Sequence, residues 1–146
     1  MSIREDLLRR DFTINAMAAP IDAVGDAVGF GPVVDLCEGA SDLEARRVRI
    51  LHADSFRDDP TRIFRAVKFA RRFDFTLDED TSSAARAAAL DGAVGRLTGA
   101  RVRNELMGVL HEAEAITALV DLHELGALSA LATPFPFDEE SRAAAS

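Results

Sequence analysis

Apolar residues recur at helical spacing through most of the chain after residue 59. In the stretch 60–73 they return every three or four positions, which predicts a helix with one buried face. The positions concerned are Ile63, Ala66, Val67 and Ala70. Asp59 and Pro60 are residue types favoured at the start of a helix, so we expect this helix to begin there.

The same spacing predicts three further helices. They cover 82–90, a stretch from 99 or 100 to 112, and 113–125. Asp80 is expected to cap the first of them, and Gly126 to end the last. In the middle one, four side chains are expected to point inward: Val102, Leu106, Val109 and Leu110.

The beginning of the chain has a less regular pattern. An apolar run over 12–19 is too short to distinguish a helix from a strand. Asp11 is a favoured helix cap, and Pro20 would end a helix. The glycines within 24–29 indicate a turn, because glycine readily adopts a positive φ.

Two short strands and a short helix are predicted next. The β-branched runs at 33–36 and 48–51 are bounded by turn residues, as strands usually are. Between them, a helix is expected over 41–46, where Ser41 and Glu44 have the spacing of a capping box. These patterns together predict an α+β protein that is mostly α.

Composition narrows the class of protein. The 146 residues allow one domain, or one domain and part of another, and an apolar fraction of 48% excludes disorder as the main state. No stretch approaches the ~18 uninterrupted apolar residues of a membrane span, and the charged residues at 1–6 are unlike a signal peptide. Cys37 is the single cysteine, so a reducing, cytoplasmic location is expected. The prolines, acids and small residues of 133–146 predict a frayed tail.

The net charge of −8 argues against a general nucleic-acid binder, which usually carries a basic excess. One basic stretch nevertheless lies within residues 46–72. Its members are Arg46, Arg47, Arg49, Arg57, Arg62, Arg65, Lys68, Arg71 and Arg72. The opposing acids are Asp54, Asp58 and Asp59. The charge pattern alone leaves two interpretations open: a solvated helix face or a binding patch.

Several common kinds of site lack support in the sequence. The three histidines, His52, His111 and His123, are scattered, and no group has the spacing of zinc ligands. Nothing in the sequence pairs Cys37 or a serine with a histidine as a nucleophile, and neither common glycine-rich phosphate loop is present. No metal site is therefore predicted.

The start of the helix at residue 60 carries a more informative pattern. A carboxylate at Asp59 and a guanidinium at Arg62 can together read a base edge, the first accepting from an amino group and the second donating to the adjacent ring nitrogen. Cytosine and adenine present that pair, whereas guanine and uracil do not. Arg65 and Lys68, further along, could neutralise a triphosphate. The simpler alternative is that Asp59 caps the helix and the basic residues are exposed or paired with acids.

Four segments resemble, in order and spacing, the motifs of class II tRNA nucleotidyltransferases (CCA-adding enzymes) and bacterial poly(A) polymerases. Residues 6–18, DLLRRDFTINAMA, resemble the motif RRDFTINAMA. Residues 35–43 resemble D-x-x-x-G-x-x-D-L, 56–69 resemble the base-selecting motif F-x-[ED]-D-P-x-R-x-x-R-A-x-[RK]-F, and 97–106 resemble the last motif between head and neck. The resemblance covers roughly residues 2–130.

The resemblance implies a domain organisation. Residues 1–52 would form the C-terminal part of a nucleotidyltransferase head, as a remnant of its β-sheet. Residues 53–132 would form the helical neck, which binds nucleotide and RNA, and 133–146 would be a flexible tail. A missing N-terminal segment or a second copy would cover the exposed edge of the sheet.

The resemblance also implies roles for individual residues. Arg10 would contact the nucleotide phosphates and Asp11 the ribose hydroxyl, while Asp59 and Arg62 would read the base as argued above. These are nucleotide-binding rather than catalytic roles.

The remaining matched residues would hold the triphosphate or organise the site. Arg65 and Lys68 would bind the triphosphate, although Lys68 stands where an arginine is usual and lacks the two-pronged donor group. Asn15 and Arg101 would support the site without contacting substrate. Ala100 departs from the glutamate that many relatives have, so the last motif is met only in part.

The family's Asp-x-Asp pair, which binds the catalytic Mg²⁺ ions, has no counterpart before Arg9. The nearest similar run, 78–80, is expected to be a helix cap. The chain is thus expected to be the nucleotide-selecting and RNA-binding portion of an enzyme that adds C, A or both to RNA 3′ ends without a template. CTP and ATP would be its substrates and tRNA or another RNA its partner. Alone, it is expected to be inactive.

Two rival interpretations remain. The chain could be a non-catalytic adaptor that keeps a nucleotide or RNA pocket, or the product of a broken reading frame without a function of its own. Within the family, CC-adding, A-adding, CCA-adding and poly(A) activities share these motifs, and the sequence favours none of them. It also leaves the oligomeric state open.

Overall fold

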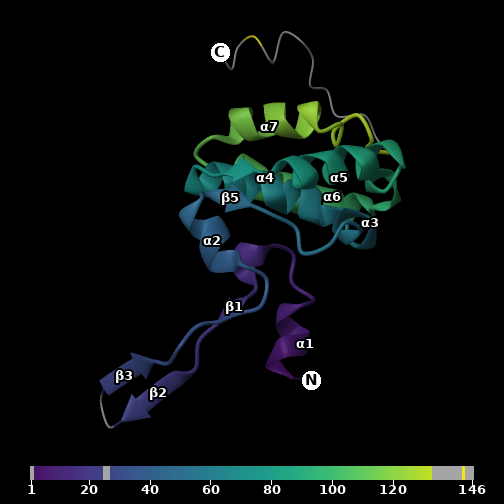
Figure 1. Cartoon of the computed structure of the whole chain (residues 1–146). Helices are drawn as coiled ribbons and strands as arrows, with labels where there is room; N and C mark the ends of the chain where they lie inside the picture. Colours follow the sequence, from purple (N-terminus) through teal and green to yellow (C-terminus); the bar gives the residue numbers. More distant parts are fainter. Residues whose placement is uncertain (1, 25–26, 133–142, 144–146) are drawn as a thin grey trace.

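The computed structural model describes residues 2–24, 27–132 and 143 of the chain. Most of its helices gather in one body, and a β-hairpin projects away from that body (Figure 1). The long helices are α4 (Thr61–Phe73), α5 (Glu79–Leu90), α6 (Gly99–Leu110) and α7 (Ala115–Glu124). The shorter ones are α1 (Ile3–Leu7), α2 (Gly39–Glu44), α3 (Ser55–Asp58) and the 3₁₀ turns η1 (Thr13–Asn15) and η2 (Val94–Arg96). The expected α+β class, mostly α, is confirmed.

The strands form three separate pairs. β1 (Met17–Ala18) and β4 (Val34–Asp35) are antiparallel, as are β2 (Ile21–Val24) and β3 (Ala27–Phe30) in the projecting hairpin. β5 (Arg47–Val48) and β6 (Thr76–Leu77) are parallel. The last pair joins one strand from each side of the predicted domain boundary between residues 52 and 53. The boundary itself stays a prediction.

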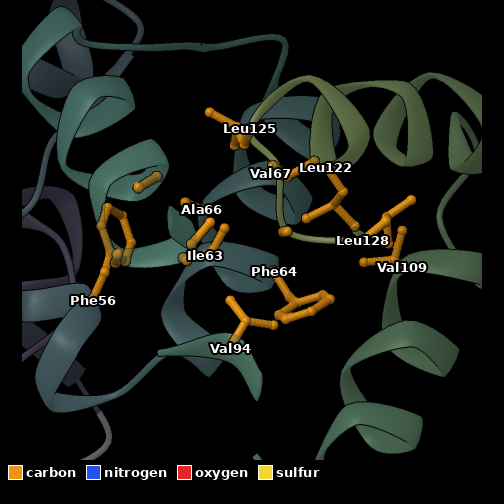
Figure 2. Close-up of a cluster of buried hydrophobic side chains, with 14 of the residues drawn as sticks. Phe56, Ile63, Phe64, Ala66, Val67, Val94, Val109, Leu122, Leu125 and Leu128 are labelled. Atoms are coloured by element: carbon orange, nitrogen blue, oxygen red, sulfur yellow. The ribbon is translucent and has the colours of Figure 1, made fainter. Parts of the chain in front are cut away.

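Helix α4 runs through the centre of the hydrophobic core. Its predicted buried face is confirmed, and Phe64 adds a large buried ring to it. Figure 2 shows how this face meets side chains from α3, η2, α6, α7 and the segment that follows α7. The surrounding residues include Phe56, Val94, Val109, Leu122, Leu125 and Leu128. Burial of this apolar area stabilises the helix at ~25 cal/mol per Å² removed from water.

Several predicted helix starts are wrong by a few residues. Helix α5 is capped by Asp78, which accepts a hydrogen bond from the Thr81 N–H at 2.9 Å, and Asp80 lies inside its first turn. Helix α2 begins at Gly39 rather than at 41, and Ser41 forms no capping box. The N–H groups at the start of α2 instead bond to Asp35, a contact that local spacing could not reveal.

Other elements differ in kind from the prediction. The run 12–19 resolves into η1 followed by β1, and Asp11 bonds to neighbouring groups without capping a helix. Part of the predicted turn at 24–29 is strand β3. Leu110 is 45% exposed rather than inward, because it lies at the last position of α6. The predicted frayed tail lies outside the described residues except for residue 143.

No helix among the described residues is long and apolar enough to cross a membrane.

On the projecting hairpin, Ile21 pairs with Phe30 across the two strands, and both side chains are exposed. Val28, two residues before Phe30 and therefore on the same face, is exposed as well. The apolar face that these residues form is uncovered.

A buried carboxylate joins the amino-terminal segment to the strands that follow it. Asp42 of α2 is fully buried and accepts a hydrogen bond from the Thr13 hydroxyl at 2.6 Å. Two guanidinium groups reach it as well, from Arg47 at 2.7 Å and from Arg49 at 2.7 Å. Burial by itself would raise the pKa of Asp42, but the bonds from Thr13, Arg49 and Arg47 outweigh it and hold the pKa below its ordinary value.

We therefore predict that Asp42→Asn lowers the free energy of unfolding at pH 7 by about 2 kcal/mol, since it removes charge-assisted bonds in a buried place. A lowered carboxyl pKa stabilises the fold above about pH 4 and ceases to do so as the pH falls through the folded-state pKa. Urea unfolding between pH 7 and pH 3 should show the difference between the two proteins shrinking toward acid.

Asp74→Asn is the matched control for this prediction. Asp74 is 97% exposed and lies 3.7 Å from Arg46, so its replacement should leave stability unchanged at every pH. A pH-independent difference between Asp42→Asn and the unaltered protein would contradict the assigned ionisation.

Candidate functional site

An open, strongly polar hollow of about 430 Å³ lies at the amino-terminal end of α4. Three parts of the chain form its wall: the segment after α1, the first turns of α4, and α6. The lining residues are Arg10, Asp11, Asn15, Asp59, Thr61, Arg62, Arg65 and Glu105. Six of the eight residues singled out in the sequence thus meet at one place, and Arg101 and Lys68 are not among the lining residues.

Asp11 and Arg65 form an ion pair between residues 54 positions apart in the sequence. The Arg65 Nε and Nη2 atoms lie 2.8 and 2.5 Å from Asp11 Oδ2. The other oxygen of Asp11 accepts from the Phe12 N–H at 2.9 Å and from the Asn15 amide at 3.1 Å. The guanidinium of Arg65 also lies over the ring of Phe69, 5.7 Å from its centre. The two residues that the sequence assigned separately, to ribose and to triphosphate, are therefore bound to each other.

Asp59 has one oxygen engaged by the protein. Its Oδ1 atom accepts from the N–H of Thr61 at 3.2 Å, from the hydroxyl of Thr61 at 2.6 Å and from Arg101 Nη2 at 3.1 Å. No hydrogen bond reaches Oδ2 from the residues that the structure describes. The N-cap of α4 is Pro60 and its first helical residue is Thr61, each one position later than expected. Asp59 therefore precedes the N-cap and supports the helix start from there.

Arg62 differs from the other arginines of α4 in its partners. Its Nη1 atom donates to the Ser55 hydroxyl at 2.7 Å, and its Nη2 atom donates to the Arg9 carbonyl at 3.4 Å. Both partners are neutral, and no ion pair joins Arg62 to Asp59 within residues 2–24 and 27–132. The positive charge of Arg62 is therefore left without a carboxylate in the described part of the chain.

Arg10 and Lys68 lie at or beyond the edge of this arrangement. Arg10 pairs with Asp6 at 2.5 Å, and the hydrogen bond that its guanidinium donates to this exposed carboxylate raises the pKa of Arg10. The Lys68 Nζ atom lies 3.4 Å from the point where a side-chain carbon of residue 108 would be, so Gly108 leaves room for it against α6. The expected triphosphate role of Lys68 stays a prediction.

Three polar residues of the site were missed in the sequence. Thr61 and Glu105 line the hollow, and Ser55 holds the guanidinium of Arg62. Thr61 could have been suspected from its place beside Asp59 at a helix start. Glu105 and Ser55 gave no signal, because only the packing of α6 and α3 against α4 brings them near.

Other hollows on the described part of the chain include two that do not gather the predicted site residues. One, of about 290 Å³, lies near the end of α4 beside the Arg71–Asp121 ion pair. The other, of about 400 Å³, lies beside Ile50 and the start of α5. The described residues contain no group of three or more His, Cys, Asp or Glu side chains that could hold a metal ion.

Comparison with known proteins agrees with the motifs. Residues 1–49 match the family described as Poly A polymerase head domain. An A-adding tRNA nucleotidyltransferase of Geobacter sulfurreducens is 39% identical over 127 residues, which are 87% of this chain and 14% of the relative. A solved CCA-adding enzyme with ATP superposes with a TM-score of 0.78 at 38% identity, and one with CTP superposes with 0.76 at 36%. The chain belongs to the class II tRNA nucleotidyltransferase family.

The chain spans only part of these tRNA nucleotidyltransferase relatives. With each of the two solved enzymes, the match includes 88% of this chain but only 30% of the enzyme. The hollow at α4 is built from segments that the family motifs occupy, 6–18, 56–69 and 97–106. In this member of the family, those motifs therefore meet within the chain itself.

The Asp11–Arg65 pair is expected to stabilise the wall of the hollow. Replacing Asp11 with Asn keeps an oxygen for the Phe12 N–H but removes the charge that faces Arg65. Because Asp11 is only 7% exposed, we predict a loss of about 1–2 kcal/mol in the free energy of unfolding, measured by urea denaturation.

Asp6→Asn serves as the control, since it removes the charge from the exposed Asp6–Arg10 pair at the same edge of the hollow. It should leave the unfolding curve unchanged. Equal effects of the two substitutions would mean that the Asp11–Arg65 contact has no special role in stability.

Proposed function

We propose that this chain provides the nucleotide-selecting and RNA-binding portion of a tRNA nucleotidyltransferase or poly(A) polymerase, which adds C, A or both to RNA 3′ ends without a template. The observation that carries the proposal is the presence, in one hollow, of two groups: an Asp59 oxygen that receives no hydrogen bond from the described residues, and Arg62, whose partners among those residues are both neutral. The similar enzymes solved with ATP and with CTP support it.

The two side chains offer opposite hydrogen-bonding groups to a base. The Oδ2 atom of Asp59 accepts, and the guanidinium of Arg62 donates. Cytosine places an amino group next to an unprotonated ring nitrogen, and so does adenine, so either base satisfies both partners. Guanine and uracil place a carbonyl next to a protonated nitrogen, which leaves both partners mismatched. Each mismatched polar group costs about 1–3 kcal/mol.

The phosphates are assigned to the basic residues around the base-reading pair. Arg10 lines the hollow with an exposed guanidinium, and Arg65 retains donor groups beyond the two that bind Asp11. Lys68 lies further along α4, from where it adds positive charge without reading a base. Because charge attracts every nucleotide triphosphate equally, these residues set affinity rather than choice.

No described residue of this chain is assigned to a metal ion. The motif resemblance implies that the whole enzyme uses Mg²⁺, and the described residues include no group of three or more His, Cys, Asp or Glu side chains that could hold it. The residues of this chain are assigned to binding and orienting the nucleotide.

Asp59→Ala tests the base-reading assignment. We predict that the unaltered chain binds CTP and ATP more tightly than UTP and GTP, and that Asp59→Ala reduces this preference about tenfold or more, since it removes the acceptor that both amino groups need. Titration of the ¹⁵N-labelled chain with each of the four nucleotides, followed by NMR, measures the dissociation constants.

Two further variants complete the experiment. Asp58→Ala removes the neighbouring carboxylate, which is 63% exposed and outside the hollow, and should leave the preference intact. Lys68→Ala should raise the dissociation constants of all four nucleotides by one common factor. If the chain binds none of them, the proposed function is wrong; if Asp59→Ala keeps the preference, Asp59 only supports the helix.

A further inference from the structure

One oxygen of Asp59 accepts three hydrogen bonds, two from Thr61 and one from Arg101. We infer that Thr61, helped by Arg101, is a positioning residue that fixes the direction of the free Oδ2 atom of Asp59 and thereby sets nucleotide choice without contacting the base. This inference rests on the proposed function and assigns it a residue outside the base-reading pair.

Thr61 holds the other oxygen of Asp59 with two donors at once. Its hydroxyl lies 2.6 Å and its backbone nitrogen 3.2 Å from Asp59 Oδ1. Thr61 is only 5% exposed, so water competes weakly for these bonds. It is also the first residue of α4, and Ile63 and Phe64, two and three residues later, are fully buried. The donors are therefore attached to a rigid part of the fold.

Arg101 adds a third donor from a different helix. Its Nη2 atom lies 3.1 Å from the same oxygen of Asp59, across 42 residues of sequence. Its side chain is 54% exposed, so we expect a smaller contribution than that of Thr61. With three donors on Oδ1, the carboxylate plane and the position of Oδ2 are both defined.

Orientation matters because the terminal torsion of an aspartate is broad and roughly two-fold when nothing holds it. A carboxylate that rotates freely would offer its acceptor in many directions and would accommodate a mismatched base more easily. A fixed Oδ2 favours an amino group at one place and penalises a carbonyl there. Preorganisation of this kind reduces the cost of ordering the site when the ligand binds.

Thr61 also has an ordinary structural role, since its contact with Asp59 supports the start of α4. The test must therefore separate nucleotide choice from stability. Thr61→Val removes the hydroxyl and keeps the shape, whereas Thr61→Ser keeps the hydroxyl. Thr81→Val is the matched control, because Thr81 is another buried threonine at a helix start, whose oxygen accepts from the Ile50 N–H at 3.1 Å.

The measurement is the set of dissociation constants for CTP, ATP, UTP and GTP, by the same NMR titration, together with the urea unfolding curve of each variant. We expect Thr61→Val to lower the preference for CTP over UTP about fivefold, the order of one lost hydrogen bond. Thr61→Ser, which retains the hydroxyl, should keep the preference of the unaltered chain. Thr81→Val should lower stability and leave the preference unchanged.

The double variant Asp59→Ala/Thr61→Val shows whether Thr61 acts through Asp59. If it does, the double variant has the same low preference as Asp59→Ala alone, because residues that act as a unit are not additive. An additive loss overturns the inference, and so does an unchanged preference in Thr61→Val.

Should Thr61→Val not fold, Arg101→Met provides the second test. It removes the third donor from an exposed side chain and must lower the preference by a smaller factor, and an unchanged preference overturns the inference. The proposed function fails separately, if the unaltered chain binds no nucleotide or if Asp59→Ala keeps its preference.

Discussion

Burial of one face of α4 is the constraint on which the rest of the structure depends. Ile63, Phe64 and Val67 are fully enclosed by the neighbouring helices, so the helix has a single possible rotation about its axis. That rotation directs Arg62 and Arg65 to the hollow. The apolar face therefore positions the polar one, although the apolar face itself does not touch the ligand that we propose.

The amino-terminal segment completes the hollow because it is fastened to α4 in two ways. Phe12 is fully buried and meets Phe69 edge to face, with ring centres 5.9 Å apart. Next to it, Asp11 binds Arg65. An apolar anchor thus lies beside the ion pair on the side of the nearly buried Asp11, and the two contacts together hold the amino-terminal segment against α4.

Many of the chain's acidic residues form ion pairs with arginines of the basic stretch, residues 46–72. Most arginines of the basic stretch are neutralised by a carboxylate, often from a distant part of the chain. The pairs include Arg46 with Asp74, Arg47 and Arg49 with Asp42, Arg57 with Asp91, Arg65 with Asp11, Arg71 with Asp121, and Arg72 with Glu112. The charge pattern had left a solvated face and a binding patch open, and most of the stretch proves to be paired with acids. Arg62 has neutral partners in the described residues, and its role in binding a ligand stays a proposal.

The sequence by itself determined the features that depend on neighbours within a few positions. The buried face of α4, the approximate extent of α5, α6 and α7, and the grouping of Asp59 with Arg62 follow from local spacing, whereas Arg10 and Asp11 were singled out by the motif resemblance. These are properties of helical periodicity and short motifs, which a linear pattern records directly.

Only the tertiary structure decided what lies beside what. It bound Asp11 to Arg65, paired β5 with β6 in parallel, placed Lys68 outside the lining of the hollow, and brought Arg101 onto Asp59. Each of these contacts joins residues or elements whose distance in space depends on how whole helices and strands pack, and no local pattern encodes that packing. The same reason explains why Asp35, rather than Ser41, serves the start of α2.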